Sequence, residues 1–186
     1  MVSKLIKNCR SYRRFDAKKK ISAEQLRNFV ESARFVPSAG NLQRLRFACF
    51  TEQSDCDAIF PALRFAAYLK DWEGPTESER PVAYIVIASE KELDLNLAID
   101  LGIAAEAILL TAAEAGVGGC IFRSYNADLI TQILLKEEMK VHAVIALGYP
   151  TETVLLSDCR DGNIKYYRDS EDRHVVPKLP SEALIM

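Results

Sequence analysis

A short basic segment near the N-terminus carries the clearest ligand-binding chemistry in the sequence. It is Cys9-Arg10-Ser11-Tyr12-Arg13-Arg14-Phe15, which places several guanidinium groups and a hydroxyl close together. Arginine donates hydrogen bonds in a fixed fork and serine adds a short one, a combination that suits a phosphate group. Clustered charge is more often a solvated surface, and the pattern alone favours that interpretation.

Two further segments could contact a flat ligand. The segment Pro37-Ser38-Ala39-Gly40-Asn41-Leu42-Gln43 carries two amide side chains, which present a donor and an acceptor together and can match the O=C–N–H edge of a ring. Taken alone, it is more often an ordinary turn. The segment Gly116–Tyr125 begins with glycines that would let the backbone approach a flat ligand closely.

Other catalytic motifs are absent from the sequence. Gly116, Gly118 and Gly119 follow a predicted helix and precede a predicted strand, the reverse of the order in a dinucleotide-binding fingerprint. The sequence contains no P-loop and no G-x-S-x-G motif. Asp100 and Glu106 lie on one predicted helix but do not share a face. Because no side-chain catalyst is predicted, a cofactor that brings its own reactivity is favoured.

Cysteine and histidine usage argues against disulfides and metals. The five cysteines are Cys9, Cys49, Cys56, Cys120 and Cys159. Their odd number and the lack of a C-x-x-C pair predict reduced thiols in the cytoplasm. Cys49 and Cys120 lie in apolar runs and are expected in the core. His142 and His174 are expected to be structural or surface residues, and no metal site is predicted.

The composition is that of one ordinary globular domain. The chain has 186 residues, of which 49% are apolar and 27% charged, with a formal net charge of -2. This balance predicts neither nucleic-acid nor anionic-membrane binding. No charge-free apolar run reaches the roughly 18 residues of a membrane span, and the basic N-terminus lacks the apolar core of a signal peptide. We expect a single domain over residues 1–186.

Helices and strands mix without strict alternation, which favours an α+β fold. Ser22 and Gln25 predict a capped helix with an apolar stripe that ends before Pro37. Ser54 could cap a helix toward Leu69, and Asn126 could cap a later one. The other expected elements are helices over Val2–Cys9 and Leu93–Ala115, strands over Arg46–Thr51, Val82–Ala88, Gly119–Phe122 and Val141–Leu147, a loop over Asp71–Pro81, and a hairpin over Ile164–Arg168 and Arg173–Val176.

Taken together and in this order, the segments resemble the nitroreductase family. The family's R-S-x-R-x-F stretch is matched by Arg10, Ser11, Arg13 and Phe15, and its P-S-x-x-N-x-Q stretch by Pro37, Ser38, Asn41 and Gln43. A long central helix then leads to a glycine-rich turn, matched by residues 100–105 and 116–120. A strand ends in L-G-Y-P, matched by Leu147–Pro150. The likeness spans nearly the whole chain.

The resemblance implies FMN as the cofactor and assigns residues to it. Arg10, Ser11 and Arg13 would hold the phosphate and ribityl chain. In the Pro37–Gln43 segment, Asn41 would bond the isoalloxazine edge, with Ser38 and Gln43 beside it. The further site residues are Arg123 and Ser124, which would face flavin N5 and O4, and Lys178, our candidate to complete the phosphate site.

The resemblance also implies the activity and the assembly. NADH or NADPH would deliver a hydride to flavin N5, and a nitroaromatic, a quinone or a similar small-molecule acceptor would take the electrons, with ping-pong kinetics. The predicted fold is a mainly antiparallel sheet flanked by helices. Family members are intertwined homodimers with FMN at the interface, so each site would combine residues of both chains. The helix Leu93–Ala115 is expected to form that interface.

Some features depart from the family pattern and leave alternatives open. The N-x-Q motif usually continues into P-W, but here it continues into Arg44-Leu45, and Ser157–Val176 is longer than in the shortest members. Specialised chemistry (flavin breakdown, dehalogenation or azoline oxidation) and a non-catalytic flavin-binding sensor or interaction protein are therefore alternatives. Phe60–Pro81, with Tyr68 and Trp72, is expected either to cover the flavin or to be a partly ordered loop.

Overall fold

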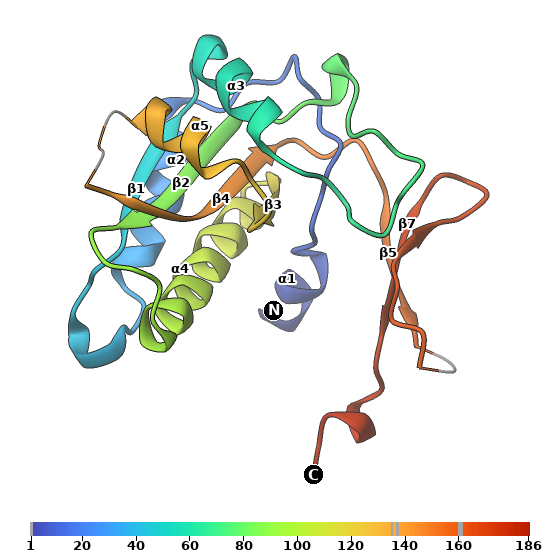
Figure 1. Ribbon diagram of the computed structural model, residues 1–186. Coiled ribbons are helices and arrows are strands. Elements are labelled where there is room, and N and C mark those ends of the chain that lie inside the picture. The colour runs from blue at the N-terminus through green and yellow to red at the C-terminus, as the bar shows by residue number, and fades with distance from the viewer. Residues whose placement is uncertain (1, 135, 137, 160–161) are drawn as a thin grey trace.

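Helices cover both faces of a four-stranded antiparallel sheet in the computed structural model, which describes residues 2–134, 136, 138–159 and 162–186 (Figure 1). The strand order is β1-β2-β4-β3. Their bounds are β1 Arg46–Phe50, β2 Ala83–Ser89, β3 Gly118–Phe122 and β4 Lys140–Gly148. The two central strands pair with Ile85 opposite Ile145. The predicted α+β class is confirmed.

Alternating side chains on the central strands divide the core into two layers. Ile85 and Ile87 of β2 cluster with residues of α2 (Ala23–Glu31) and α4 (Leu95–Glu114). Tyr84 and Val86 cluster with residues of α3 (Gln53–Ile59) and α5 (Ala127–Leu134) on the other face. Successive strand residues face opposite sides, and both sides are covered, so β2 is buried along its whole length.

Helix α4 packs against one face of the sheet, and its C-terminal end lies just before Gly116, as the sequence predicted. Asp94 caps its N-terminus by accepting a hydrogen bond from the Leu97 amide at 2.7 Å. Gly116 follows its C-terminus with a φ of 73°, a left-handed conformation that glycine adopts without strain. By length and composition α4 could cross a membrane, a property that the core helices of globular proteins share. Its inner face packs in the core.

A second, smaller sheet lies at the C-terminal end of the chain, on the right of Figure 1. Its strands are β5 Val154–Asp158, β6 Tyr167–Arg168 and β7 His174–Lys178, in the order β5-β7-β6. The antiparallel pairing of β6 with β7 confirms the predicted hairpin, although β6 is shorter than expected. The parallel strand β5 was not predicted.

Two local predictions are wrong. Ser54 lies inside α3 rather than capping it, and the N-cap residue is Glu52. The helix stops at Ile59 and gives way to a 3-10 turn over Phe60–Ala62, because Pro61 cannot donate a helical hydrogen bond. Cys49 is exposed rather than in the core, since it lies on the edge strand β1, whereas Cys120 is buried as expected.

Candidate functional site

The predicted phosphate-binding segment runs across the ends of β3 and β4. Ser11 forms a parallel bridge with Gly119, and the Tyr12 amide donates to the Gly119 carbonyl at 3.0 Å. Phe15, fully buried, bridges Pro150. These contacts tie the segment to both strands, so the positions from which Arg10, Ser11 and Arg13 project are fixed by the sheet.

Two glycines make room for this crossing, and a third makes room for core side chains of α4 and β4. A Cβ at Gly118 would lie 2.5 Å from the Pro150 ring and 2.6 Å from the Tyr12 ring, and one at Gly148 would lie 2.7 Å from Phe15. A Cβ at Gly119 would lie 2.6 Å from Leu109. The prediction that the glycines after α4 admit a flat ligand is therefore wrong for Gly118 and Gly119, because protein side chains already fill that space.

The polar side chains of this segment differ in how many hydrogen-bond partners they have in the structure. Arg10 donates through Nη2 to the Ile6 carbonyl at 2.6 Å, and its buried Nε has no partner among the described residues. Ser11 is exposed. Arg13 donates through Nη1 to the Ser11 carbonyl at 3.2 Å, lies 3.1 Å from His174 Nε2 and stacks over the Tyr166 ring at 5.0 Å.

His174 is a buried neutral base. Because a guanidinium can only donate, Nε2 accepts from Arg13 and the ring proton lies on Nδ1. That Nδ1 has no partner among the described residues. Burial, followed by the positive charge of Arg13, lowers the pKa of His174 from 6.5 to about 4. Arg13 thus connects the predicted phosphate-binding segment to the C-terminal sheet.

The Pro37–Gln43 segment is held by helix α4. The Ala39 amide donates to the Asp100 carboxylate at 2.8 Å, and the Gln43 amide donates to Ser38 Oγ at 3.3 Å. Asn41 and Gln43 have φ values of 54° and 47°, in a left-handed region that side chains other than glycine rarely adopt. Both are exposed, and Gln43 Nε2 donates to the Asn41 carbonyl at 3.3 Å and to Asn41 Oδ1 at 3.2 Å, so the two side chains lie together at the surface. Such strain is typical of functional sites.

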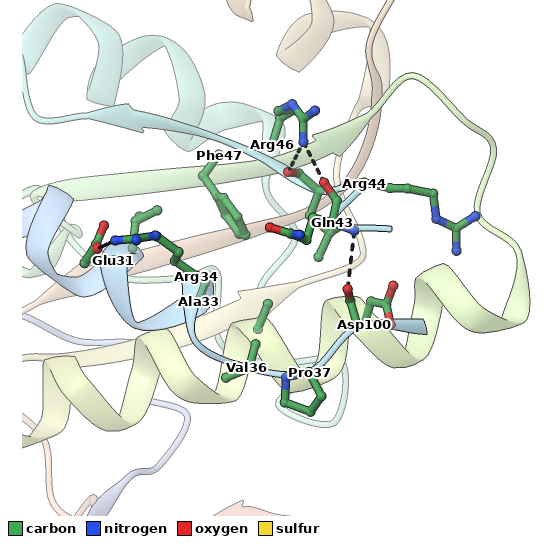
Figure 2. A pocket seen from close by; sticks show the side chains of 14 residues that line it. Glu31, Ala33, Arg34, Val36, Pro37, Gln43, Arg44, Arg46, Phe47 and Asp100 are labelled. Atoms are coloured by element: carbon green, nitrogen blue, oxygen red, sulfur yellow. Dashed lines mark hydrogen bonds and ion pairs between the residues drawn. The ribbon is translucent and has the colours of Figure 1, made fainter. Parts of the chain in front are cut away.

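A cavity of about 240 Å³ adjoins this segment. Figure 2 shows its lining side chains, among them Pro37, Gln43, Phe47 and Asp100, which come from the loop, β1 and α4. Ser38 also lines it. Of the ten predicted site residues, the cavity therefore includes Pro37, Ser38 and Gln43, and the single chain does not gather the whole set around it.

The remaining predicted residues lie at two other places. Arg123 and Ser124 are exposed just after β3, and the Ser124 carbonyl accepts the Arg64 amide at 3.0 Å, which joins them to the predicted covering segment Phe60–Pro81. Lys178 is exposed at the end of β7. The structure thus brings Arg10, Ser11 and Arg13 together and leaves the other groups apart within one chain.

Two acidic residues that organise the site were not predicted as such. Asp100 is 4% exposed, and its Oδ2 has no partner among the described residues. It is one of three acids on this mainly apolar helix, with Glu106 and Glu114, and it is the one that the structure buries. Glu152 accepts hydrogen bonds from the backbone amides of Arg13 and Arg14. Nothing in the local sequence around Glu152 indicated that role.

Other kinds of catalytic site find no support in the described parts of the chain. Within residues 2–134, 136, 138–159 and 162–186, no cluster of side chains could hold a metal ion. Ser89 Oγ lies 2.8 Å from His142 Nε2, but Ser89 is fully buried and donates to the Lys91 carbonyl. Burial raises the pKa of Cys9 and of Cys56 to about 11, which keeps both thiols protonated.

The sequence matches the model of the Nitroreductase family over residues 6–149. No curated protein matches it. Similar folds occur in solved structures. The nitroreductase family protein from Streptococcus pneumoniae TIGR4 has a TM-score of 0.72 at 14% identity, with 100% of this chain and 99% of that chain covered.

Two other similar structures come from proteins described as FMN-dependent nitroreductases. One, from Clostridium difficile R20291, has a TM-score of 0.64 at 22% identity and covers 92% of this chain and 94% of that one. The other is NfnB from Mycobacterium smegmatis, solved in complex with NADPH. It has a TM-score of 0.64 at 17% identity, with 81% of this chain and 87% of that chain covered. At these identities the likeness shows the fold.

The buried histidine predicts a loss of stability in mild acid. The folded chain keeps His174 neutral down to about pH 4, whereas the unfolded chain takes up a proton below pH 6.5. The unfolded state therefore binds more protons in this window, and the free energy of unfolding should fall by up to about 1.4 kcal/mol per pH unit for this group. Urea unfolding at pH 7, 6 and 5 measures the slope.

His174→Gln should flatten that slope. Burial also lowers the pKa of His142, so this residue adds a second contribution to the pH dependence of stability. The matched variant His142→Gln measures that contribution. An unchanged slope in His174→Gln would contradict the assignment of a neutral buried imidazole.

Proposed function

The chain belongs to the nitroreductase family, and we propose that it is an FMN-dependent oxidoreductase that uses NADH or NADPH. The strongest support comes from the Arg10–Arg13 segment, which the sheet holds in a fixed extended form. It combines two arginines and an exposed serine hydroxyl, the donor set that a phosphate group requires. Among the described residues Arg10 donates through Nη2 to Ile6, and a guanidinium carries five donors, so others are left for a ligand.

At the phosphate end, the residues would supply different kinds of contact. Arg10 and Arg13 supply positive charge, Ser11 supplies a short hydrogen bond, and Lys178 is the C-terminal candidate for a further charge. Arg13 Nη1 already has protein partners, but a guanidinium carries five donors in all, so others are left for a ligand. The chemistry of these residues fits the dianionic phosphate of FMN.

At the ring end, Asn41 would bond the isoalloxazine edge, and Pro37, Ser38 and Gln43 would lie beside it. The left-handed backbone at Asn41 and Gln43 and the hydrogen bond from the Ala39 amide to Asp100 hold this loop in one form. Arg123 and Ser124 would face the redox-active part of the ring, where Arg123 supplies positive charge for the reduced state. Bound FMN supplies the redox chemistry, taking a hydride from NADH or NADPH and passing electrons to an acceptor such as a nitroaromatic or a quinone.

The covering segment fits a role in substrate selection. Two guanidinium groups lie near the Trp72 ring, with Arg14 at 5.6 Å and Arg168 at 5.4 Å from its centre. Tyr68 packs against Tyr166 in a tilted arrangement, with ring centroids 4.9 Å apart. These contacts fix the segment Phe60–Pro81 against the C-terminal sheet, so it is ordered enough to limit what approaches the site.

We also propose a homodimer with FMN at the interface, formed by the single domain over residues 1–186. Helix α4 exposes Leu95, Ile99 and Ile103 at a spacing of four residues, which makes an apolar stripe on its outer face. The C-terminal residues extend away from the sheet (Figure 1), and Leu184 and Ile185 are exposed there. A second chain that covers both surfaces could bring its Pro37–Gln43 loop to the phosphate-binding segment. Cytoplasmic location stays a prediction.

Arg10→Ala should weaken FMN binding about 10- to 100-fold, because a hydrogen bond to a charged group contributes roughly 1.5–3 kcal/mol. Calorimetric titration of flavin-free protein with FMN measures the affinity. Arg27→Ala on the exposed side of α2 is the matched control and should leave it unchanged. Unchanged FMN affinity in both Arg10→Ala and Arg13→Ala would contradict the phosphate-site assignment.

Ile99→Glu should convert the dimer into single chains, because a carboxylate buried in an apolar interface costs several kcal/mol. Sedimentation velocity measures the mass in solution. Leu129→Glu, on the exposed side of α5, changes a partly exposed leucine elsewhere and should leave the dimer intact. A wild-type protein that sediments as a monomer, or an Ile99→Glu variant that remains a dimer, would refute this interface.

A further inference from the structure

A buried carboxylate lies where the phosphate-binding segment meets the C-terminal sheet. The side chain of Glu152 is 2% exposed. Its Oε1 accepts the backbone amides of Arg13 and of Arg14, the latter at 3.2 Å, and its Oε2 accepts from Arg168 Nη2 at 2.6 Å. A carboxylate removed from water costs several kcal/mol unless donors surround it, so this position constrains all three donors at once.

Glu152 completes the hydrogen bonding of an otherwise unpaired stretch of backbone. The amides on either side already have main-chain partners, since Tyr12 donates to Gly119 at 3.0 Å and Phe15 donates to Glu79 at 2.9 Å. The amides of Arg13 and Arg14 donate to Glu152 instead. One side chain therefore takes the place of a main-chain partner where the arginines project.

The same carboxylate also fixes Arg168. Besides its bond to Glu152, this guanidinium donates through Nη1 to the Asp172 carbonyl at 2.9 Å and lies 5.4 Å from the Trp72 ring centre. Its side chain is 13% exposed, so the ion pair with Glu152 is shielded from water. Arg168 offsets the negative charge of Glu152, which would otherwise oppose a phosphate nearby.

We infer that Glu152 is a positioning residue for the phosphate end of the cofactor site. It does not contact the phosphate. It holds the backbone of Arg13 and Arg14 so that the side chains of Arg10, Ser11 and Arg13 converge on the phosphate group, and Arg168 holds Glu152 in turn. This inference rests on the proposed FMN function. It predicts that loss of Glu152 weakens binding of a flavin that carries a phosphate more than binding of one that lacks it.

Riboflavin is FMN without the phosphate, so the ratio of the two dissociation constants isolates the phosphate contribution. The experiment titrates flavin-free full-length protein with FMN and with riboflavin, and follows the quenching of flavin fluorescence. In Glu152→Gln one of the two oxygens becomes an NH2 donor, so the side chain can no longer accept from both Arg168 and the two amides, and the ion pair with Arg168 is lost. We expect FMN affinity to fall about tenfold or more, as for a lost charge-assisted hydrogen bond, while riboflavin affinity changes less than about twofold. Glu24→Gln, an exposed glutamate of α2, is the matched control.

The other outcomes separate the possible failures. Equal loss of affinity for FMN and riboflavin would show a general structural role and overturn the inference, as would an unchanged or tighter FMN affinity. A wild-type protein that binds both flavins equally would overturn the phosphate site itself, and this inference with it. If Glu152→Gln fails to fold, Arg168→Lys keeps the charge but loses the guanidinium fork. It should weaken FMN severalfold and leave riboflavin unchanged, and an unchanged FMN affinity there would also overturn the inference.

Discussion

The structure depends on one close approach, in which residues 11–15 cross the ends of β3 and β4. This crossing is possible only because Gly118 and Gly148 lack side chains, since a Cβ at Gly118 would come within 2.5–2.6 Å of Pro150 and Tyr12 and one at Gly148 within 2.7 Å of Phe15. The crossing joins three parts of the sequence: the basic segment, the glycine-rich turn after α4 and the end of the last strand in the main sheet. The backbone of residues 11–15 is held in place because it is bonded to the main sheet, which the core supports.

The C-terminal sheet and the covering segment assemble around the same crossing. Glu152 binds the crossing backbone, Arg168 binds Glu152, and Trp72 contacts both Arg168 and Arg14. Segments that are far apart in the sequence thereby meet through a few charged and aromatic side chains. Because one of these charges is buried, the cluster tolerates little rearrangement.

Much of the fold followed from hydrophobic pattern and capping. The apolar runs that became β2 and β4, the Ser22 cap of α2 and the Gly116 end of α4 all obey local rules that the sequence displays directly. The errors arose where a residue's role depends on distant partners. Gly118 and Gly119 suggested a ligand, but Tyr12 and Leu109 fill the space. Glu152 had no local signature, because its partners are amides far away in the sequence. Family resemblance indicated the site residues, and the single chain brings only part of them together.

The most direct test of the account is the visible absorbance of the purified protein, recorded without oxygen before and after addition of NADH and, separately, NADPH. The account predicts flavin absorbance bands that bleach with at least one of the two nucleotides. Bands that persist with both would contradict the enzymatic role and favour a flavin-binding sensor. An absence of flavin bands, even after incubation with FMN, would contradict the central claim that the Arg10–Arg13 and Pro37–Gln43 segments together bind FMN.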